Sequence, residues 1–157
     1  MANYIKDIRS KVGHMPIFLN AVAGAVVNDQ RQILLQQRTD AGNWSLPGGM
    51  MEYGEMFVET LKREMKEDAG LLVEPVKPLH TFEQGFTTYP NGDQAQIICR
   101  LYLVKPVGGG LEQANPNETL ALKYFDFDQL PPLFNTQSRD MIACVRAYLD
   151  GEQELKS

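Results

Sequence analysis

Few residues in this chain are of the kinds that build disulfide frameworks or zinc sites. Its 157 residues include only two cysteines, Cys99 and Cys144, and two histidines, His14 and His80. No CxxC pair occurs and no histidine stands at a metal-binding spacing, which excludes a disulfide scaffold and a zinc-finger fold. We expect both cysteines to be reduced thiols of a cytoplasmic protein, and both histidines to be packing or surface residues without a specific partner.

Long apolar runs and an excess of positive charge are also missing. The longest apolar stretch, around residues 21–27, is too short to cross a bilayer, and no signal peptide is visible at the N-terminus. The formal net charge of −5 argues against a broad nucleic-acid groove and against docking on an anionic membrane. A small phosphorylated substrate stays compatible with this charge, because bound cations would invert the local field.

What is present is typical of a globular enzyme domain. Hydrophobic residues make up 43% and charged residues 22% of the sequence, both ordinary values. A chain of this length can bury a sizeable core. We therefore expect a single domain over residues 1–157.

Hydrophobic periodicity and turn residues predict an alternation of strands and helices. Helices are predicted at residues 3–12, 55–69 and 136–149, with Thr136 as the N-cap of the last. For residues 3–12, a loosely docked terminus is an open alternative. Strands are predicted at residues 21–27, 32–38, 44–46, 71–76, 79–88, 94–104 and 120–127. Pro75 and Pro78 interrupt the extended region, and residues 105–117 are predicted to be a loop. This order indicates an α+β protein with a mixed sheet and helices on both faces.

One segment concentrates negative charge in a way that demands an explanation. Between Gly49 and Leu71 the chain carries six acidic residues: Glu52, Glu55, Glu59, Glu64, Glu67 and Asp68. Carboxylates at such density repel one another. A divalent cation is the usual way to offset that repulsion.

The spacing within the predicted helix 55–69 supports a metal site. An apolar stripe recurs at every fourth residue: Phe57, Leu61 and Met65. Glu64, Glu67 and Asp68 are three and four residues apart, so their side chains cluster. At about 100° per residue, Asp68 falls close to the stripe, where an unpaired charge is costly. Hard oxygen ligands of this kind suit Mg²⁺ or Mn²⁺.

These residues resemble the Nudix box, a motif written G-x5-E-x7-R-E-U-x-E-E-x-G-U, where U is a bulky aliphatic residue. Its positions are filled here by Gly49, Glu55, Arg63, Glu64, Met65, Glu67, Gly70 and Leu71. The one departure is Asp68, where the family usually has glutamate. So many typed positions at fixed offsets make the motif highly specific. The resemblance covers about Leu19 to Leu133, including the LLQQR and WSLPGG segments before the box.

The resemblance implies a three-layer α/β/α sandwich and the metal-dependent hydrolysis of a diphosphate inside a nucleoside diphosphate linked to another group. It makes Glu67 and Asp68 the main metal ligands, together with the carbonyl of Gly49. Glu64 either binds metal or takes the proton of the attacking water. By the same resemblance Arg63 is an organiser that pairs with Glu55, although a plain surface salt bridge is the alternative. Because aspartate is one methylene shorter than glutamate, we expect Asp68 to shift the geometry or affinity of the metal.

Candidates outside the box are less specific. Glu118 is a second candidate for the general base, with a solvated loop acid as the alternative, and Glu112 is a weaker rival. Arg38 ends a strand near the expected site and could hold a phosphate, or be an exposed strand-end arginine. Three aromatic residues could stack on a nucleobase or belong to the core: Phe82, Phe86 and Tyr89.

The sequence therefore predicts a Mg²⁺- or Mn²⁺-dependent Nudix hydrolase of a small nucleotide, with ADP-ribose or a nucleotide sugar favoured. A nucleoside triphosphate pyrophosphohydrolase that removes damaged nucleotides is one alternative. A Nudix-fold nucleotide-binding module without turnover is another. The expected partners include no nucleic acid and no membrane, and a homodimer is left open.

Overall fold

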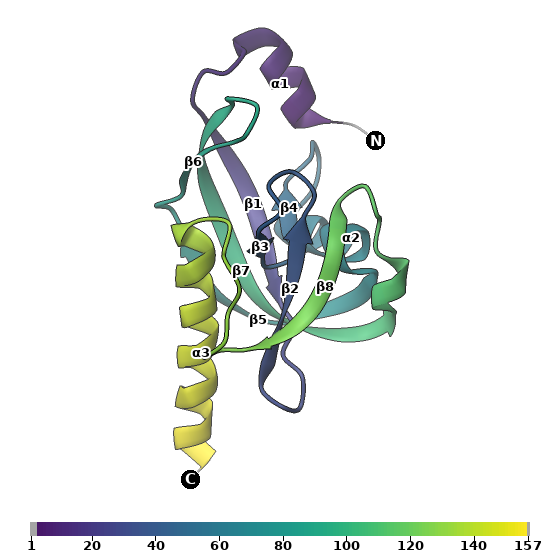
Figure 1. The fold of residues 1–157 in the computed structure, drawn as a ribbon, viewed down its shortest axis with the longest axis vertical. Coiled ribbons are helices and arrows are strands. Elements are labelled where there is room, and N and C mark those ends of the chain that lie inside the picture. The colour runs from purple at the N-terminus through teal and green to yellow at the C-terminus, as the bar shows by residue number, and fades with distance from the viewer. Residues whose placement is uncertain (1–2, 157) are drawn as a thin grey trace.

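The computed structural model describes residues 3–156, which fold into β-sheets flanked by helices (Figure 1). The elements in chain order are α1 (Tyr4–Val12), β1 (Ile17–Ala25), β2 (Gln32–Arg38), β3 (Trp44–Ser45), β4 (Gly48–Met50), α2 (Phe57–Ala69), β5 (Leu71–Phe82), β6 (Phe86–Thr88), β7 (Gln94–Gly109), a 3₁₀ turn (Leu111–Gln113), β8 (Thr119–Asp126) and α3 (Thr136–Lys156).

The strands divide between two sheets. The larger sheet has the order β4-β1-β7-β5, with β6 added on β7, and the smaller has the order β3-β2-β8. Strands β1 and β7 run parallel, whereas the other pairs are antiparallel. The predicted α+β class and mixed sheet are thus confirmed, with the strands shared between two sheets.

Side chains alternate along β1 between two hydrophobic core clusters, one on each face of the larger sheet. Ala21, Ala23 and Ala25 face a core cluster that includes Met141, Ile142 and Val145 of α3. Val22 and Val26 face a second cluster that includes Leu61, Met65 and Ala69 of α2. Successive side chains of a strand point to opposite faces, so α3 and α2 cover opposite faces of the larger sheet, as predicted (Figure 1).

Strand β5 differs from its prediction, because it continues through Pro75 and Pro78 to Phe82, whereas the predicted strand 79–88 is divided there and its last residues form β6. It pairs with β7 with register shifts at Leu72/Val73, Pro75/Lys77 and Pro78/His80. Since β5 lies at the end of the sheet order, the missing proline N–H groups are tolerated, and the bulges absorb the irregularity. The same pairing extends β7 to Gly109, into residues predicted to be a loop.

Other helix and strand boundaries also differ from the predicted ones. β1 begins at Ile17 rather than residue 21, because it pairs with β7 from Ile17 onward. Gly48–Met50, for which no strand is predicted, forms β4 by pairing with β1. The N-cap prediction for α3 is wrong by one residue: Ser138 N donates to Asn135 Oδ1 at 2.8 Å, so Asn135 caps the helix and Thr136 is its first residue.

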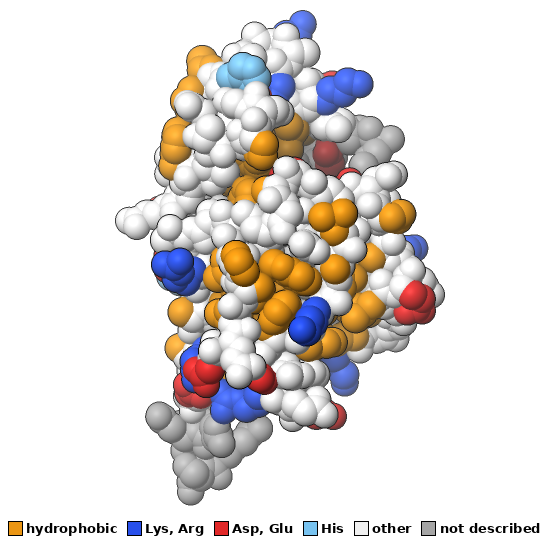
Figure 2. Space-filling model, in the orientation of Figure 1, with side chains coloured by type: hydrophobic (Ala, Val, Ile, Leu, Met, Phe, Trp, Pro, Cys, Tyr) orange, Lys and Arg blue, Asp and Glu red, His pale blue; other side chains and the backbone are white. Residues whose placement is uncertain are grey.

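The surface is mixed in character. On the face shown in Figure 2, hydrophobic side chains gather across the middle, over the smaller sheet, and charged side chains lie mostly towards the edges. Within residues 3–156, no helix is both long and apolar enough to cross a bilayer.

Candidate active site

Helix α2 carries its acidic residues beside the apolar stripe that packs on the core, and Asp68 among them is buried. Leu61 and Met65 are completely buried against the larger sheet. The helix ends at Gly70, whose φ of +72° is left-handed, and a Cβ there would collide with the carbonyl of Gly110. Only glycine fits both conditions. The end of α2 is thereby fixed, and the carboxylates of its last turns are held in place.

Asp68 is the most buried carboxylate of the group, with 4% of its surface exposed. Its Oδ2 accepts a hydrogen bond from Gly48 N at 3.1 Å, and its carbonyl accepts one from the Thr119 hydroxyl at 2.7 Å. Burial, followed by the nearby charge of Glu64, raises the pKa of Asp68 to about 8. One backbone donor does not compensate the buried charge.

Glu64 lies against the backbone of Gly49. A Cβ added at Gly49 would collide with the Glu64 carboxylate, so a side chain there would displace the carboxylate from its present position. Burial raises the pKa of Glu64 to about 7, although Arg63 works in the opposite direction. Like charges at Glu67 and Glu118 add to the rise.

Arg63 is the cation that several of these acids share. Its Nε and Nη2 donate to the two oxygens of Glu55 at 2.7 and 2.9 Å, and its Nη1 donates to Glu64 at 2.8 Å and Glu67 at 3.4 Å. Nη2 also donates to the carbonyl of Met50. The expected pair with Glu55 is therefore present. It is bidentate, and the side chains are only 22% and 17% exposed, unlike a plain surface salt bridge.

Glu118 reaches the same group of acids from the smaller sheet. Its charge raises the pKa values of both Glu64 and Asp68. Buried Gln36 of β2 fixes this approach, because its Nε2 donates to the carbonyl of Glu118 at 3.2 Å and to the Thr119 hydroxyl at 2.8 Å. The weaker rival Glu112 is exposed and does not line the cleft.

The predicted site residues share one cleft of about 480 Å³, a size usual for small-molecule sites. Its lining includes Arg38, Gly49, Arg63, Glu64, Glu67, Asp68, Tyr89 and Glu118. Phe82 and Phe86 are not part of that lining. Phe82 packs against the core and Phe86 is exposed. Of the three candidate aromatics, the structure therefore brings only Tyr89 to the cleft.

Some cleft residues gave no signal in the sequence. Asn3, Ile5 and Arg9 of the N-terminal segment line it, as does Asp93. They lie far along the chain from the motif, so local spacing could not reveal them. The expectation that His14 has no partner was wrong, because its Nδ1 lies 2.7 Å from Asp93 Oδ1.

The carboxylates of the cleft suit a hard divalent cation, although their side chains do not surround a common point. Among the residues that the structure describes, no three His, Cys, Asp or Glu side chains converge on a point able to hold a metal ion. Arg63 and the amide of Gly48 engage oxygens of Glu64, Glu67 and Asp68 instead. Carboxylate oxygens are nevertheless ligands that suit Mg²⁺ or Mn²⁺. The negative charges of these carboxylates also outnumber the single positive charge of Arg63 that they share.

Comparison with known proteins agrees with this arrangement. A family model of the NUDIX domain matches residues 18–144. Because this match covers most of the chain and includes the acidic helix, the chain belongs to the NUDIX domain family.

Similar proteins carry several activities in their names. The chain is 34% identical over 141 residues to the human 8-oxo-dGDP phosphatase NUDT18, covering 86% of the chain and 40% of the relative. It is 30% identical over 116 residues to the ADP-ribose pyrophosphatase of Methanocaldococcus jannaschii, covering 72% and 64% respectively. The chain spans 30% to 40% of the length of the mouse, human and zebrafish NUDT18 proteins.

Solved structures share the fold. A MutT NUDIX hydrolase from Burkholderia pseudomallei superposes with a TM-score of 0.68 at 27% identity, over 83% of this chain and 98% of that one. An ADP-ribose pyrophosphatase from Streptococcus suis superposes with a TM-score of 0.62 at 26% identity, over 83% and 91%.

Proposed function

We propose that this protein is a divalent-cation-dependent hydrolase that breaks the diphosphate linkage of a small nucleoside diphosphate derivative. One observation carries the proposal: Glu64, Glu67, Asp68 and Glu118 converge on one cleft, where Arg63 is the cation bound to Glu64 and Glu67. Asp68 and Glu64 are only 4% and 13% exposed, and burying carboxylates with so little compensation is costly. The cost is explained if the site functions with additional positive charge bound.

The residues that would hold the cation are Glu67 and Asp68, with the carbonyl of Gly49; Glu64 would either bind the cation as well or act as the base. Bound Mg²⁺ or Mn²⁺ would neutralise phosphate oxygens and lower the pKa of the attacking water. Arg63 orients Glu64 and Glu67 through Nη1 while Glu55 anchors its other nitrogens. Arg63 is thus a positioning residue.

Hydrolysis needs a group that accepts the proton of water. The water oxygen forms a new bond to phosphorus, the bridging P–O bond breaks, and the proton passes to a carboxylate. Glu64 is our preferred base, because Gly49 and Arg63 both constrain its carboxylate. Glu118 is the alternative, since it lines the same cleft from the side of the smaller sheet.

ADP-ribose or a nucleotide sugar is our favoured substrate, supported by the ADP-ribose pyrophosphatases among the relatives and solved structures. A second candidate is a damaged nucleoside di- or triphosphate, which the names of the NUDT18 relatives favour.

The decisive experiment is a hydrolysis screen of nucleoside diphosphate derivatives and oxidised nucleotides, with Mg²⁺, Mn²⁺ or excess chelator. We expect turnover only with metal, and Glu67→Gln should lose most of it while keeping the fold. Glu112→Gln is the matched control, because Glu112 is exposed and outside the cleft. Full activity in excess chelator would contradict metal dependence. Tight nucleotide binding without any turnover would instead identify a binding module.

A further inference from the structure

The cleft has two walls that differ in charge. The acidic wall consists of Glu64, Glu67, Asp68 and Glu118. The second, which we call the neutral wall, is formed by residues of α1, by the turn from Tyr89 to Asp93, and by Arg38 with Asp40. Its two arginines each face an aspartate: Arg38 Nη2 lies 2.6 Å from Asp40, and Arg9 Nε lies 3.6 Å from Asp93. The arginines and aspartates of this wall therefore balance, so it offers no excess charge to a phosphate.

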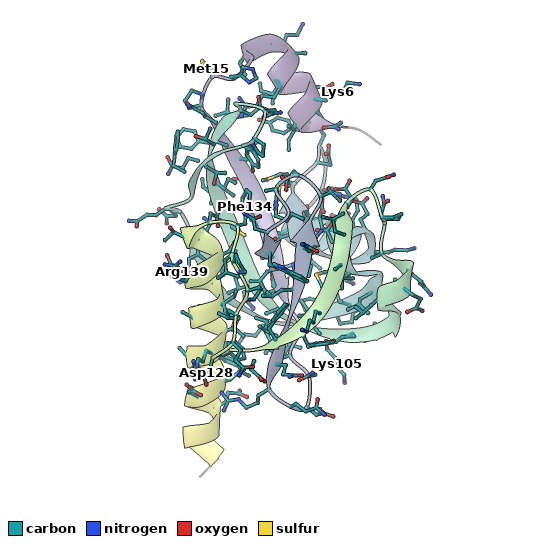
Figure 3. All side chains as sticks on the ribbon, viewed as in Figure 1. Lys6, Met15, Lys105, Asp128, Phe134 and Arg139 are labelled. Atoms are coloured by element: carbon teal, nitrogen blue, oxygen red, sulfur yellow. The ribbon has the colours of Figure 1, made fainter. Side chains whose placement is uncertain are left out.

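Arg38 is held in a way that leaves a flat surface. Its Nε and Nη2 donate to the two oxygens of Asp40 at 2.9 and 2.6 Å, which occupies that edge of the guanidinium. Phe134, labelled in Figure 3, covers one face with its ring centroid 3.9 Å from Cζ. Within residues 3–156, no further partner contacts Nη1, and the side chain stays 27% exposed in the cleft lining, which leaves the other face for a ligand. A guanidinium constrained in this way suits stacking on a planar ring better than bidentate phosphate binding.

Helix α1 closes the cleft on this side although none of its residues is buried. Ile5 and Arg9 line the cleft. The helix is fastened by packing of Tyr4 and Ile5 against the first core cluster and by polar contacts: Tyr4 N donates to Glu52 at 2.9 Å, and Arg9 Nη2 donates to the carbonyl of Gln94 at 2.6 Å. Figure 1 shows α1 at the end of the molecule, apart from α2 and α3. The N-terminal helix thus supplies an apolar side chain to a wall without net charge.

We propose that the neutral wall is the nucleobase subsite: the base stacks on the guanidinium of Arg38 and packs against Ile5 and Tyr89, while the diphosphate lies at the acidic wall. Within residues 3–156, the Tyr89 hydroxyl makes no hydrogen bond, so it is available to a polar edge of the base. This inference deepens the proposed function and rests on it for the place of the diphosphate. It also gives Arg38 a role different from phosphate binding.

Calorimetry with matched product-like ligands tests the subsite without requiring turnover. AMP and GMP carry a base, ribose 5-phosphate does not, and each is titrated into the full chain with Mg²⁺. We expect the mononucleotides to bind more tightly. Arg38→Lys keeps the charge but removes the plane, so it should weaken mononucleotide binding about tenfold and leave ribose 5-phosphate unchanged. An equal loss for both ligands would show that Arg38 binds phosphate, which overturns the proposal.

A second variant tests the contribution of α1. Ile5→Ala should weaken mononucleotide binding several-fold without affecting ribose 5-phosphate. Lys6→Ala is its control on the same helix, because Lys6 is exposed and outside the cleft lining (Figure 3). Unchanged mononucleotide affinity in both Arg38→Lys and Ile5→Ala overturns the subsite even if the parent hydrolyses diphosphates. Base-dependent binding by a parent that hydrolyses nothing would refute the proposed function and keep the subsite.

Discussion

Glu55, at the entrance to α2, and Asp68, in its last turn, belong to the same motif, yet their pKa values move in opposite directions. Hydrogen bonds from Arg63 lower the pKa of Glu55 to about 2. Burial raises that of Asp68 to about 8, with Glu64 adding to the effect. The difference follows from where the single arginine of the motif, Arg63, makes its hydrogen bonds. The charge of Glu55 at the entrance is compensated by Arg63, whereas that of Asp68 in the last turn is not.

The largest effect should come from removing the base near Asp68. Glu64→Gln keeps the shape of the side chain but cannot accept a proton, so kcat should fall about a hundredfold or more while substrate binding stays nearly intact. Glu118→Gln should then be mild. Steady-state kinetics of both variants at saturating Mg²⁺ decide between the two carboxylates, and a negligible effect of Glu64→Gln would reverse our preference.

Changing Asp68 itself should act on the metal. Asp68→Ala removes a hard ligand and should weaken Mg²⁺ or Mn²⁺ binding by about tenfold or more. Asp68→Glu restores the residue usual in the motif and should keep or improve activity. Metal titrations followed by calorimetry give the affinities. If the alanine variant bound metal as well as the parent, Asp68 would not be a ligand.

At the entrance, weakening the pair of Arg63 with Glu55 should cost stability. Arg63→Lys replaces a bidentate fork by a single ammonium, which removes the two arginine donors of Glu55, although its Oε1 keeps those of Glu52 N and the Thr60 hydroxyl. We expect a loss of about 1.5 to 3 kcal/mol in the free energy of unfolding, measured by urea titration. Lys62→Ala is the control, because the ion pair of Lys62 with Glu74 is exposed. Equal stability of Arg63→Lys and the parent would show that the pair is dispensable.

The smallest effect is a pH dependence of stability without metal. For Asp68 and Glu64 the folded pKa values, about 8 and about 7, lie above the ordinary values of 3.8 and 4.5 that these carboxyls have in the unfolded chain. The folded state therefore retains protons that the unfolded state loses, and stability falls as pH rises from about 4 to 8. Glu55, with its pKa lowered from 4.5 to about 2, acts oppositely, and its contribution is lost as pH falls from 4.5 towards 2.

Urea titrations across this range should show a decline of about 1 kcal/mol or more between pH 5 and pH 8. Saturating Mg²⁺ should flatten the decline, because the cation binds the deprotonated carboxylates. Asp68→Asn should also reduce it. A metal-free stability that rises steadily to pH 8 would show that the buried carboxylates are already compensated.

The motif itself was well predicted because its information is local. Helix 55–69 was expected and α2 spans Phe57–Ala69, since propensity, the apolar stripe and the terminal glycine agree. The pair of Arg63 with Glu55 is also local, because the two residues lie only eight positions apart, at the entrance of α2 and two turns further along it. Strand boundaries were less accurate, because β1, β4 and the end of β7 are defined by their partners rather than by their own residues.

The sequence by itself thus determined the family, the acidic helix and the chemical type of the site. Tertiary structure decided which other groups meet that helix. Pairing of β2 with β8 delivers Glu118 to Asp68, and the docking of α1 delivers Ile5 and Arg9 to the opposite wall. Arg38 was visible in the sequence, but its partners Asp40 and Phe134 give its guanidinium an orientation that no spacing rule contains. Periodicity records which face of an element is buried, whereas contacts between distant elements depend on how the whole core packs.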